Sequence, residues 1–230
     1  MPIPRNLRRN FFKTWSREMA YVLGFFTADG NMIKNRRGAY FIAFYSNDRE
    51  LLANVKAVLG SNHKIGKRMY KTSKRSTSYQ LQLGSREMFD DLLRIGMTPA
   101  KSLTLRLPQI PNTYCRDFVR GYFDGDGCVY FAFLKCADRK RPRPVFQSIF
   151  TCGSRLFLEE LLSLLKQHGI SRGTIRNKRH GFDILLSHRD SLALFHLMYD
   201  TVPATGLFLP RKYKIFRKAI KTLYPDAAVV

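Results

Sequence analysis

The sequence predicts an α+β protein of two pseudo-symmetric halves, each with the element order helix, strand, strand, helix, strand, strand, helix. Three observations support this prediction. An apolar run that ends in Asp-Gly occurs twice, in "YVLGFFTADG" at 21–30 and in "DFVRGYFDGDG" at 117–127. The same succession of strand-like and amphipathic pieces follows each copy. A chain of 230 residues can form two packed halves of about 100 to 120 residues each.

The first element of each half is an apolar helix. Both runs are apolar nearly all the way round, so each helix must be buried on more than one face, and the two are best buried against each other. Gly24 and Gly121 occupy the same place in the two copies. Because glycine has no Cβ, we expect these positions to let the paired helices approach closely.

The remaining elements follow in the same order in both halves. Aromatic and β-branched residues predict strand pairs within 31–47 and 63–85, and within 128–152 and 172–187. Helical periodicity predicts helices at 48–60 and 154–169. Asp48 and Ser154 are the expected N-caps, and Gly60 and Gly169 close the C-terminal ends. Further helices are expected around 86–95 and 190–199.

The domain boundaries follow from composition. We expect a basic N-terminal arm at residues 1–16, a first half at 17–110 and a second half at 111–230, joined through the short, proline-bounded segment "LPQIPNTY". The arm lacks the apolar stretch of a secretory signal, and either an organelle transit peptide or an arm that touches phosphates fits its composition. No apolar run approaches the 18 or so residues that cross a bilayer. We therefore expect no membrane partner and an intracellular location, in a prokaryotic cytoplasm or an organelle.

The charge indicates a polyanionic partner. Forty Lys and Arg residues oppose 17 acidic ones, which gives a net charge of +23. Such a surplus repels itself in the folded state and is typical of nucleic-acid binding rather than of an enzyme for small neutral ligands. The four cysteines form no C-x-x-C pair, which favours free thiols over a zinc site.

Asp29 and Asp126 end the two apolar helices and carry the most specific signal. A carboxylate at a helix C-terminus opposes the macrodipole, and two nearby carboxylates repel each other. A divalent cation would compensate both effects, and the carbonyl groups of Ala28 and Gly125 would add the hard oxygen ligands that suit Mg²⁺. The glycine after each aspartate is expected to make a left-handed turn out of the helix.

These segments resemble the two motifs of a single-chain LAGLIDADG homing endonuclease, read here as "VLGFFTADG" at 22–30 and "VRGYFDGDG" at 119–127. The resemblance covers nearly the whole chain, because the intervening strand and helix order also matches. It implies motif helices packed at a pseudo-twofold axis, two saddle-shaped antiparallel sheets that lie on DNA, and catalytic metal binding by Asp29 and Asp126. Thr27 replaces the usual motif aspartate that the second copy keeps as Asp124, and we expect this position to serve packing or capping.

The resemblance also implies the function. We expect a monomer without an obligate protein partner that hydrolyses one phosphodiester in each strand of a long, non-palindromic double-stranded DNA site, using two or three Mg²⁺ ions. An RNA maturase that assists intron splicing and a cleavage-inactive DNA-binding protein remain alternatives.

The family carries a basic residue near each metal. The segment "GMTPAKSLTLRLP" points to Lys101. In the second half, one alignment places Thr205 opposite Lys101, whereas the segment "FLPRKYKIF" points to Lys212. A lysine near phosphate oxygens can offset charge or organise a water molecule. Gln147, on a second-half strand, is a further candidate for positioning water.

Base recognition is expected from strand residues that alternate between two faces. In "SYQLQLG", Tyr79, Leu81 and Leu83 are expected to face the core. Gln80 and Gln82 would then face outward, where glutamine can read adenine edges. Further candidates for guanine or phosphate contacts are Lys34, Arg36, Lys67, Arg68, Arg176 and Lys178.

Overall fold

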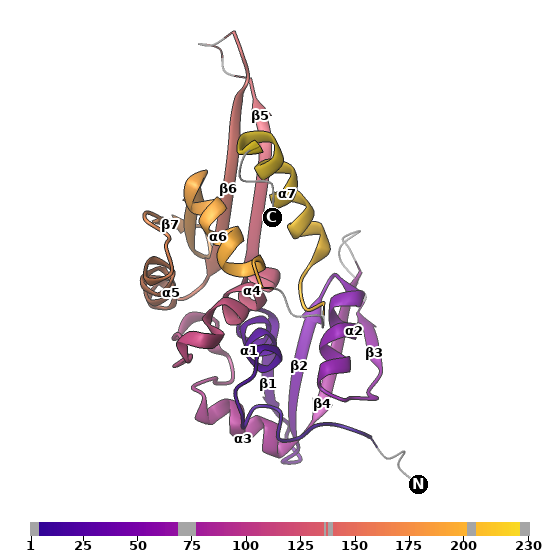
Figure 1. Ribbon diagram of the computed structural model, residues 1–230. Helices are drawn as coiled ribbons and strands as arrows, with labels where there is room; N and C mark the ends of the chain where they lie inside the picture. The colour runs from indigo at the N-terminus through magenta and orange to yellow at the C-terminus, as the bar shows by residue number, and fades with distance from the viewer. Residues whose placement is uncertain (1–4, 69–76, 136, 138–139, 202–205, 226–230) are drawn as a thin grey trace. The chain divides into compact units, whose positions relative to one another are not determined.

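A computed structural model describes residues 5–68, 77–135, 137, 140–201 and 206–225 (Figure 1). The chain forms two compact units. Unit 1 comprises Met1–Lys101, Pro108–Gly125 and Val202–Leu207, and unit 2 comprises Ser102–Leu107, Asp126–Thr201 and Phe208–Val230. The proposed boundary between residues 110 and 111 differs from this division, because the second motif helix packs with the N-terminal elements.

The order of helices and strands confirms the predicted fold class. The first half contains α1 (Arg17–Asp29), β1 (Gly30–Lys34), β2 (Tyr40–Ser46), α2 (Arg49–Val58), β3 (Ile65–Arg68), β4 (Ser78–Gly84) and α3 (Arg86–Arg94). The second half contains α4 (Cys115–Asp126), β5 (Gly127–Leu134), β6 (Arg143–Cys152), α5 (Arg155–Gln167), β7 (Thr174–Lys178), β8 (Gly181–Ser187), α6 (Arg189–Tyr199) and α7 (Pro210–Leu223). Short 3₁₀ turns occur at Lys101–Leu103 and Asn112–Tyr114.

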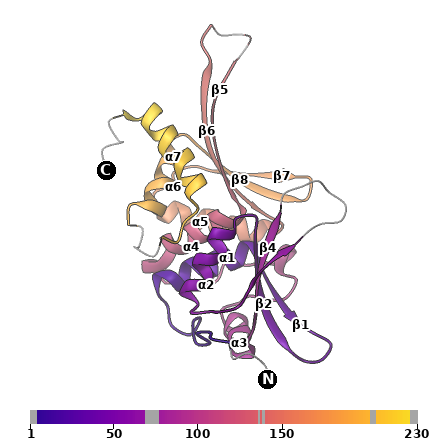
Figure 2. The ribbon, with the colours of Figure 1, turned by 90° about the vertical axis from the view of Figure 1, so that its right-hand side faces the viewer.

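Both halves build the same antiparallel sheet. The strand orders are β1-β2-β4-β3 and β5-β6-β8-β7, and every neighbouring pair is antiparallel. The hairpin of β5 and β6 is longer than that of β7 and β8, as Figure 2 shows. Helix α7 extends the predicted order of the second half. It opens on Pro210, whose fixed φ suits the first turn of a helix.

The motif helices α1 and α4 pack together within unit 1. All residues of α1 from Met19 to Thr27 are buried, as expected for a helix that is apolar all round. A Cβ on Gly24 would lie 2.1 Å from the Phe118 carbonyl oxygen, and a Cβ on Gly121 would lie 2.0 Å from the Tyr21 carbonyl oxygen. The backbone of each helix therefore packs directly against the glycine of the other, and the two backbones are closer than a residue with a Cβ would allow.

The helix ends agree with the sequence in most places. Asp48 and Ser154 accept hydrogen bonds from backbone N–H groups in the first turns of α2 and α5, which confirms both N-caps. Gly60 and Gly169 adopt positive φ values of 57° and 92° beyond those helices. The expected left-handed turn after α1 is wrong, because Gly30 has a φ of −97° and continues directly into β1. Glycine is required at this position because a Cβ added there would lie 2.3 Å from the Phe26 carbonyl oxygen.

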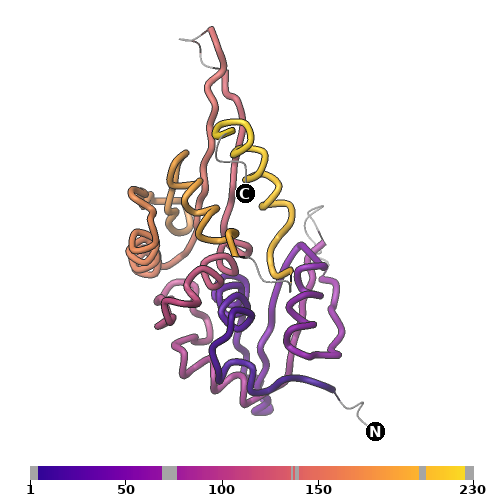
Figure 3. The backbone as a smooth tube through the Cα atoms, viewed as in Figure 1, coloured from indigo at the N-terminus to yellow at the C-terminus, as the bar shows by residue number. Residues whose placement is uncertain are grey.

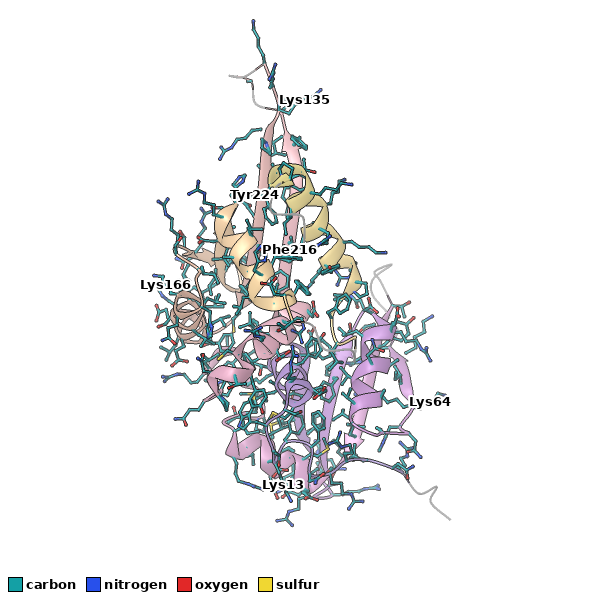
Figure 4. The ribbon with its side chains drawn as sticks, in the orientation of Figure 1. Lys13, Lys64, Lys135, Lys166, Phe216 and Tyr224 are labelled. Atoms are coloured by element: carbon teal, nitrogen blue, oxygen red, sulfur yellow. The ribbon has the colours of Figure 1, made fainter. Side chains whose placement is uncertain are left out.

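The sheet register sets which face of each sheet is covered. In unit 1, Ile42 pairs with Leu83 and Phe44 pairs with Leu81, and all four side chains are fully buried. Tyr79 shares their face and is half-buried at the end of β4. In unit 2, Phe146 of β6 is buried and packs edge-on against Phe216 of α7, with ring centroids 5.9 Å apart. Phe216 is labelled in Figure 4. In both sheets the alternate residues are left for an outer face.

His63, which precedes β3, links stability to pH. Burial lowers the pKa of His63 below 6.5, and the charges of Arg5 and Lys56 lower it further. The unfolded chain therefore binds a proton at His63 more readily than the folded chain does, and protonation favours unfolding. The stability that neutral His63 contributes is complete above the unfolded pKa and is lost as pH falls through 6.5 toward the folded pKa. We expect the urea midpoint to drop between about pH 7.5 and 5.5, a window above most carboxylate titrations. His63→Gln should flatten this dependence, and an unchanged slope would contradict it.

Candidate functional site

Two buried lysines hold the chain at the ends of the two motif helices. Lys101, 7% exposed, donates from Nζ to the carbonyl oxygen of Gly30 at 2.6 Å. Lys212, 3% exposed, donates from Nζ to the carbonyl oxygen of Gly127. Gly30 and Gly127 directly follow Asp29 and Asp126. The same arrangement of aspartate, glycine carbonyl and lysine ammonium is therefore built once in each half.

The two lysines reach equivalent places from different elements. Lys101 lies in a 3₁₀ turn after α3, whereas Lys212 lies in the first turn of α7. Helix α7, which carries Lys212, is the yellow coil of the tube in Figure 3. Burying an ammonium group is costly unless it is well hydrogen-bonded, so the burial of two of the forty basic side chains is unusual. Thr205, the alternative in the second half, lies outside the described residues.

The carboxylate of Asp29 borders a space that a side chain would fill. A Cβ on Gly125 would lie 2.4 Å from the Ala28 Cβ and 3.2 Å from Asp29 Oδ2. Asp29 itself is half-buried, and Asp126, the residue after Gly125, is exposed. Carbonyl groups in the last turn of a helix lack a partner within that helix, so those of Ala28 and Gly125 remain candidate ligands.

This donor set fits Mg²⁺. Carboxylate and carbonyl oxygens are the hard ligands that this ion prefers, and it is commonly held by one or two carboxylates plus substrate phosphates. Within the described residues, no three or more His, Cys, Asp or Glu side chains gather to hold a metal.

The cysteines take no part in this site. Cys115 and Cys152 are buried free thiols, and burial raises the pKa of the Cys115 thiol. Cys128 is also a free thiol and is exposed. Cys136 lies outside the described residues.

The outer face of the first sheet carries a connected polar row. Gln80 donates from Nε2 to Gln82 Oε1 at 2.9 Å and to the Tyr45 hydroxyl at 3.4 Å. The Arg68 guanidinium lies 5.1 Å from the centre of the Tyr45 ring. These side chains share one face because Tyr45 pairs with Gln80 in the register.

The structure separates the other lysine and arginine candidates of unit 1 from this row. Lys34 pairs with Tyr40 and lies 5.3 Å from its ring centre, on the face that buries Met32. Lys67 pairs with Tyr79 and therefore lies on the same face as Lys34, opposite the face that carries the polar row. Arg36 lies in the turn between β1 and β2 and is exposed.

The outer face of the second sheet brings Arg176 and Lys178 together. Both are exposed, and both flank Asp183, which pairs with Arg176 in the register and lies 3.5 Å from Lys178 Nζ. Gln147 lies on the same face, paired with Tyr130. It is three register positions from the partner of Gly127, about 10 Å along the strand. Gln147 is therefore placed with the outer-face residues and not beside Lys212.

A buried ionic cluster was not predicted from the sequence. Arg120 and Asp117 are both fully buried in α4 and form an ion pair of 2.6 Å. Arg17 of α1 also contacts Asp117, at 3.3 Å, and the Tyr21 hydroxyl donates to Asp124 at 2.7 Å. Thr27, which matches Asp124, donates to the Leu23 carbonyl oxygen. The i, i+3 spacing of Asp117 and Arg120 was the signal in the sequence for this cluster.

None of the helices in the described part of the chain combines the length and apolar character needed to span a bilayer.

Comparison with solved structures places the fold among DNA-bound proteins. The homing endonuclease I-WcaI bound to its DNA recognition sequence superposes with a TM-score of 0.61 and 12% identity, over 94% of this chain and 95% of that one. I-SmaMI bound to cleaved DNA gives a TM-score of 0.59 and 12% identity, over 94% and 92%. I-SmaMI bound to an uncleaved target with calcium ions gives 0.57 and 14%, over 94% of each chain.

Sequence comparison identifies the family. No curated protein sequence matches the chain significantly. The profile of the LAGLIDADG-like domain matches it twice, over residues 16–95 and 113–197, each time beginning just before a motif helix and ending directly after α3 in the first half and within α6 in the second. Because these two repeats together cover well over half of the sequence, the chain belongs to the LAGLIDADG-like domain family.

Proposed function

We propose that this protein is a site-specific double-strand DNA endonuclease that depends on a divalent metal. The observation that carries the proposal is the repeated site, in which a buried lysine holds the carbonyl group of the glycine that follows each motif aspartate. A protein that only binds DNA has no need of two buried ammonium groups next to two acidic helix ends.

Double-stranded DNA is supported as the substrate by charge and by the relatives. The net charge of +23 suits a polyanion, and the outer faces of both sheets carry amide and basic side chains that can reach base edges and phosphates. I-WcaI and I-SmaMI, which share this fold, are homing endonucleases bound to DNA. The outer-face residues differ between the two sheets, so we infer a long target that is not a palindrome.

The reaction divides into roles for the chain's own residues. Hydrolysis breaks one phosphorus–oxygen bond in each strand, as a water oxygen bonds to phosphorus and the leaving oxygen takes a proton. Lys101 in one half and Lys212 in the other offset the negative charge that develops on the phosphate. Asp29 in one half and Asp126 in the other would hold Mg²⁺, which would supply Lewis-acid chemistry for activating water. The carbonyl groups of Gly30 and Gly127 hold each ammonium at the residue that directly follows the motif aspartate.

Selection of cleaved sites from a random DNA library tests this proposal. With Mg²⁺, we expect one long sequence to be enriched and both strands to be cut. Failure to cut any member with Mg²⁺ or Mn²⁺ would contradict it. If the protein cuts no DNA but promotes splicing of an intron RNA, the maturase alternative is supported instead.

Loss of either buried lysine is expected to slow cleavage about 10²- to 10³-fold, as removal of one preorganised donor does elsewhere. Lys101→Met and Lys212→Met keep most of the side-chain length and remove the charge. Single-turnover cleavage rates of the selected site, measured for each strand, should show each variant slowing mainly one strand. Lys166→Met, on the exposed face of α5 (Figure 4), is the matched control and should cut at the wild-type rate. Equal rates for all three variants would contradict the assignment.

A further inference from the structure

The N-terminal arm, whose described part begins at residue 5, is held on unit 1 by its backbone. The Arg8 N–H donates to the Leu59 carbonyl oxygen at 3.0 Å, and the Asn6 N–H donates to Asn62 Oδ1 at 3.0 Å. The Asn62 N–H donates in turn to the Asn6 carbonyl oxygen at 3.4 Å. The arm therefore follows the connection between α2 and β3, and its course before α1 can be traced in Figure 1.

Two further contacts hold the arm in place. Gly60 has a φ of 57°, and a Cβ added to it would lie 3.0 Å from Arg8 Cγ, so the glycine makes room for the arm. Phe11 and Phe12 are 5% and 3% exposed and anchor the arm nearer to α1. The backbone is thus held on both sides of Arg9.

Alternate residues of the arm border a cavity of about 610 Å³ in unit 1. Arg5, Leu7 and Arg9 line this cavity. The side chain of Arg8 points elsewhere, since its Nη1 donates to the carbonyl oxygen of the last residue of α2 at 3.3 Å. Such alternation is typical of an extended chain, in which neighbouring side chains point in opposite directions.

The cavity adjoins the polar row on the outer face of the first sheet. Gln82, a member of that row, lines the cavity together with Gly84. Phe41 lines it as well and pairs with Gly84 in the register. A duplex whose base edges meet Gln80 and Gln82 would carry its sugar–phosphate backbone along the rim of the groove. The cavity lies beside the row, where such a backbone would pass.

The cavity is positively charged. Arg5, Arg9 and Lys64 contribute three exposed cationic groups, and none of the described residues that line the cavity is acidic. His63 also lines it, and its pKa is lowered by burial and further by the charge of Arg5. A neighbouring cavity that shares Arg9 differs, because the carboxylate of Glu87 lines it. Cationic groups without an acidic neighbour suit an anion, and guanidinium groups match the geometry of phosphate.

We propose that this cavity binds a phosphate group of the DNA backbone and that the N-terminal arm is a fixed part of the DNA interface. Arg5, Arg9 and Lys64 supply the charge, and the volume admits a phosphate with the sugars on either side. This inference rests on the proposed DNA substrate and does not depend on cleavage. It favours an arm that touches phosphates over the transit peptide that its composition also allows.

Binding to DNA tests the proposal without relying on cleavage. The DNA is selected from a random library by binding in Ca²⁺, and dissociation constants are measured between about 50 and 200 mM salt. Arg5→Gln and Arg9→Gln each remove one exposed charge and should leave the fold intact. We expect each variant to bind about tenfold more weakly. The slope of the logarithm of affinity against the logarithm of salt concentration should become shallower by about 1.

Uncharged phosphates locate the contact on the DNA. In a series of duplexes, one phosphate at a time is replaced by a methylphosphonate, which carries no charge. The wild-type protein should lose affinity at each phosphate that it contacts. At the phosphate held in the cavity, Arg5→Gln should lose little further affinity, because the two changes remove the same contact.

Lys13→Gln is the matched control, since it removes one charge from the same arm. Lys13 pairs with Glu87, and Figure 4 shows it well away from Lys64. We expect wild-type affinity and salt dependence from this variant. Equal weakening by Lys13→Gln, Arg5→Gln and Arg9→Gln would indicate a general basic surface and overturn the proposal.

Two other results would also overturn the proposal. These are wild-type affinity of Arg5→Gln and Arg9→Gln, and the absence of any phosphate at which the effects of substitution and methylphosphonate coincide. The endonuclease function stands in both cases if the wild-type protein cuts DNA. If the wild-type protein binds the selected DNA but cuts nothing, the proposed function fails while the phosphate site is still tested. If it binds no double-stranded DNA, both fail.

Discussion

Replacement of Asp29 or Asp126 by asparagine is expected to reduce DNA cleavage at least about a thousandfold, a loss of about 4 kcal/mol of transition-state stabilisation. Asparagine keeps the shape of the side chain but removes the negative charge that holds a divalent cation. Binding of the DNA site should change little, since the sheet faces and the basic surface supply the affinity. Single-turnover cleavage and a binding titration in Ca²⁺ measure the two effects separately.

Asp90→Asn is the matched control for this prediction. Asp90 lies on the exposed surface of α3, where it pairs with Arg86 at 3.6 Å. We expect wild-type cleavage from this variant. Cleavage retained by both Asp29→Asn and Asp126→Asn would show that the motif carboxylates do not bind the metal, whereas loss of DNA binding would show that they act in folding or recognition.

Substitution of alanine at Gly24 or Gly121 is expected to destabilise the fold by at least about 3 kcal/mol each, at the upper end of overpacking costs. The added Cβ would meet backbone atoms of the neighbouring helix at 2.1 and 2.0 Å, and backbone cannot rotate away as a side chain can. Alanine gains about 1 kcal/mol in helix propensity, which is too little to offset the clash. The unfolding temperature should fall by about 6 to 12 °C for a chain of this size.

Gly66→Ala serves as the control for the glycine substitutions. A Cβ at that position in β3 would lie 3.8 Å from the Gln80 carbonyl oxygen, an ordinary contact distance. We expect it to change stability by less than about 1 kcal/mol. If Gly24→Ala and Gly121→Ala unfold at the same temperature as Gly66→Ala, the helices do not depend on close backbone approach.

The repeated pattern allowed most of the fold to be predicted, because local signals repeat in both halves. The Asp48 and Ser154 caps, the glycines after α2 and α5, and the alternation in β4 each follow from backbone chemistry within a few residues. Two copies of every predicted element made each prediction a check on the other. The role of Gly24 and Gly121 could be predicted for the same reason, since their positions in the two motifs are identical.

The rest depended on contacts between distant segments, which local patterns do not report. Gly30 is required by the carbonyl group and ring of Phe26, so a rule for helix termini misassigned its conformation. The faces of Lys34 and Lys67 follow from strand register, which the sequence left open. Arg120 bonds to a carbonyl group 87 residues away, and no spacing rule connects the two. Helix α7 lies beyond the repeated pattern and so had no second copy to reveal it.

Manganese binding to the protein–DNA complex tests the central claim most directly. Mn²⁺ replaces Mg²⁺ at oxygen sites and is counted by electron paramagnetic resonance. We predict that the wild-type complex with the selected site holds Mn²⁺ tightly, and that the double variant Asp29→Asn, Asp126→Asn loses this binding while still holding the DNA. Equal Mn²⁺ binding by the two complexes would contradict the assignment of these aspartates as the metal ligands.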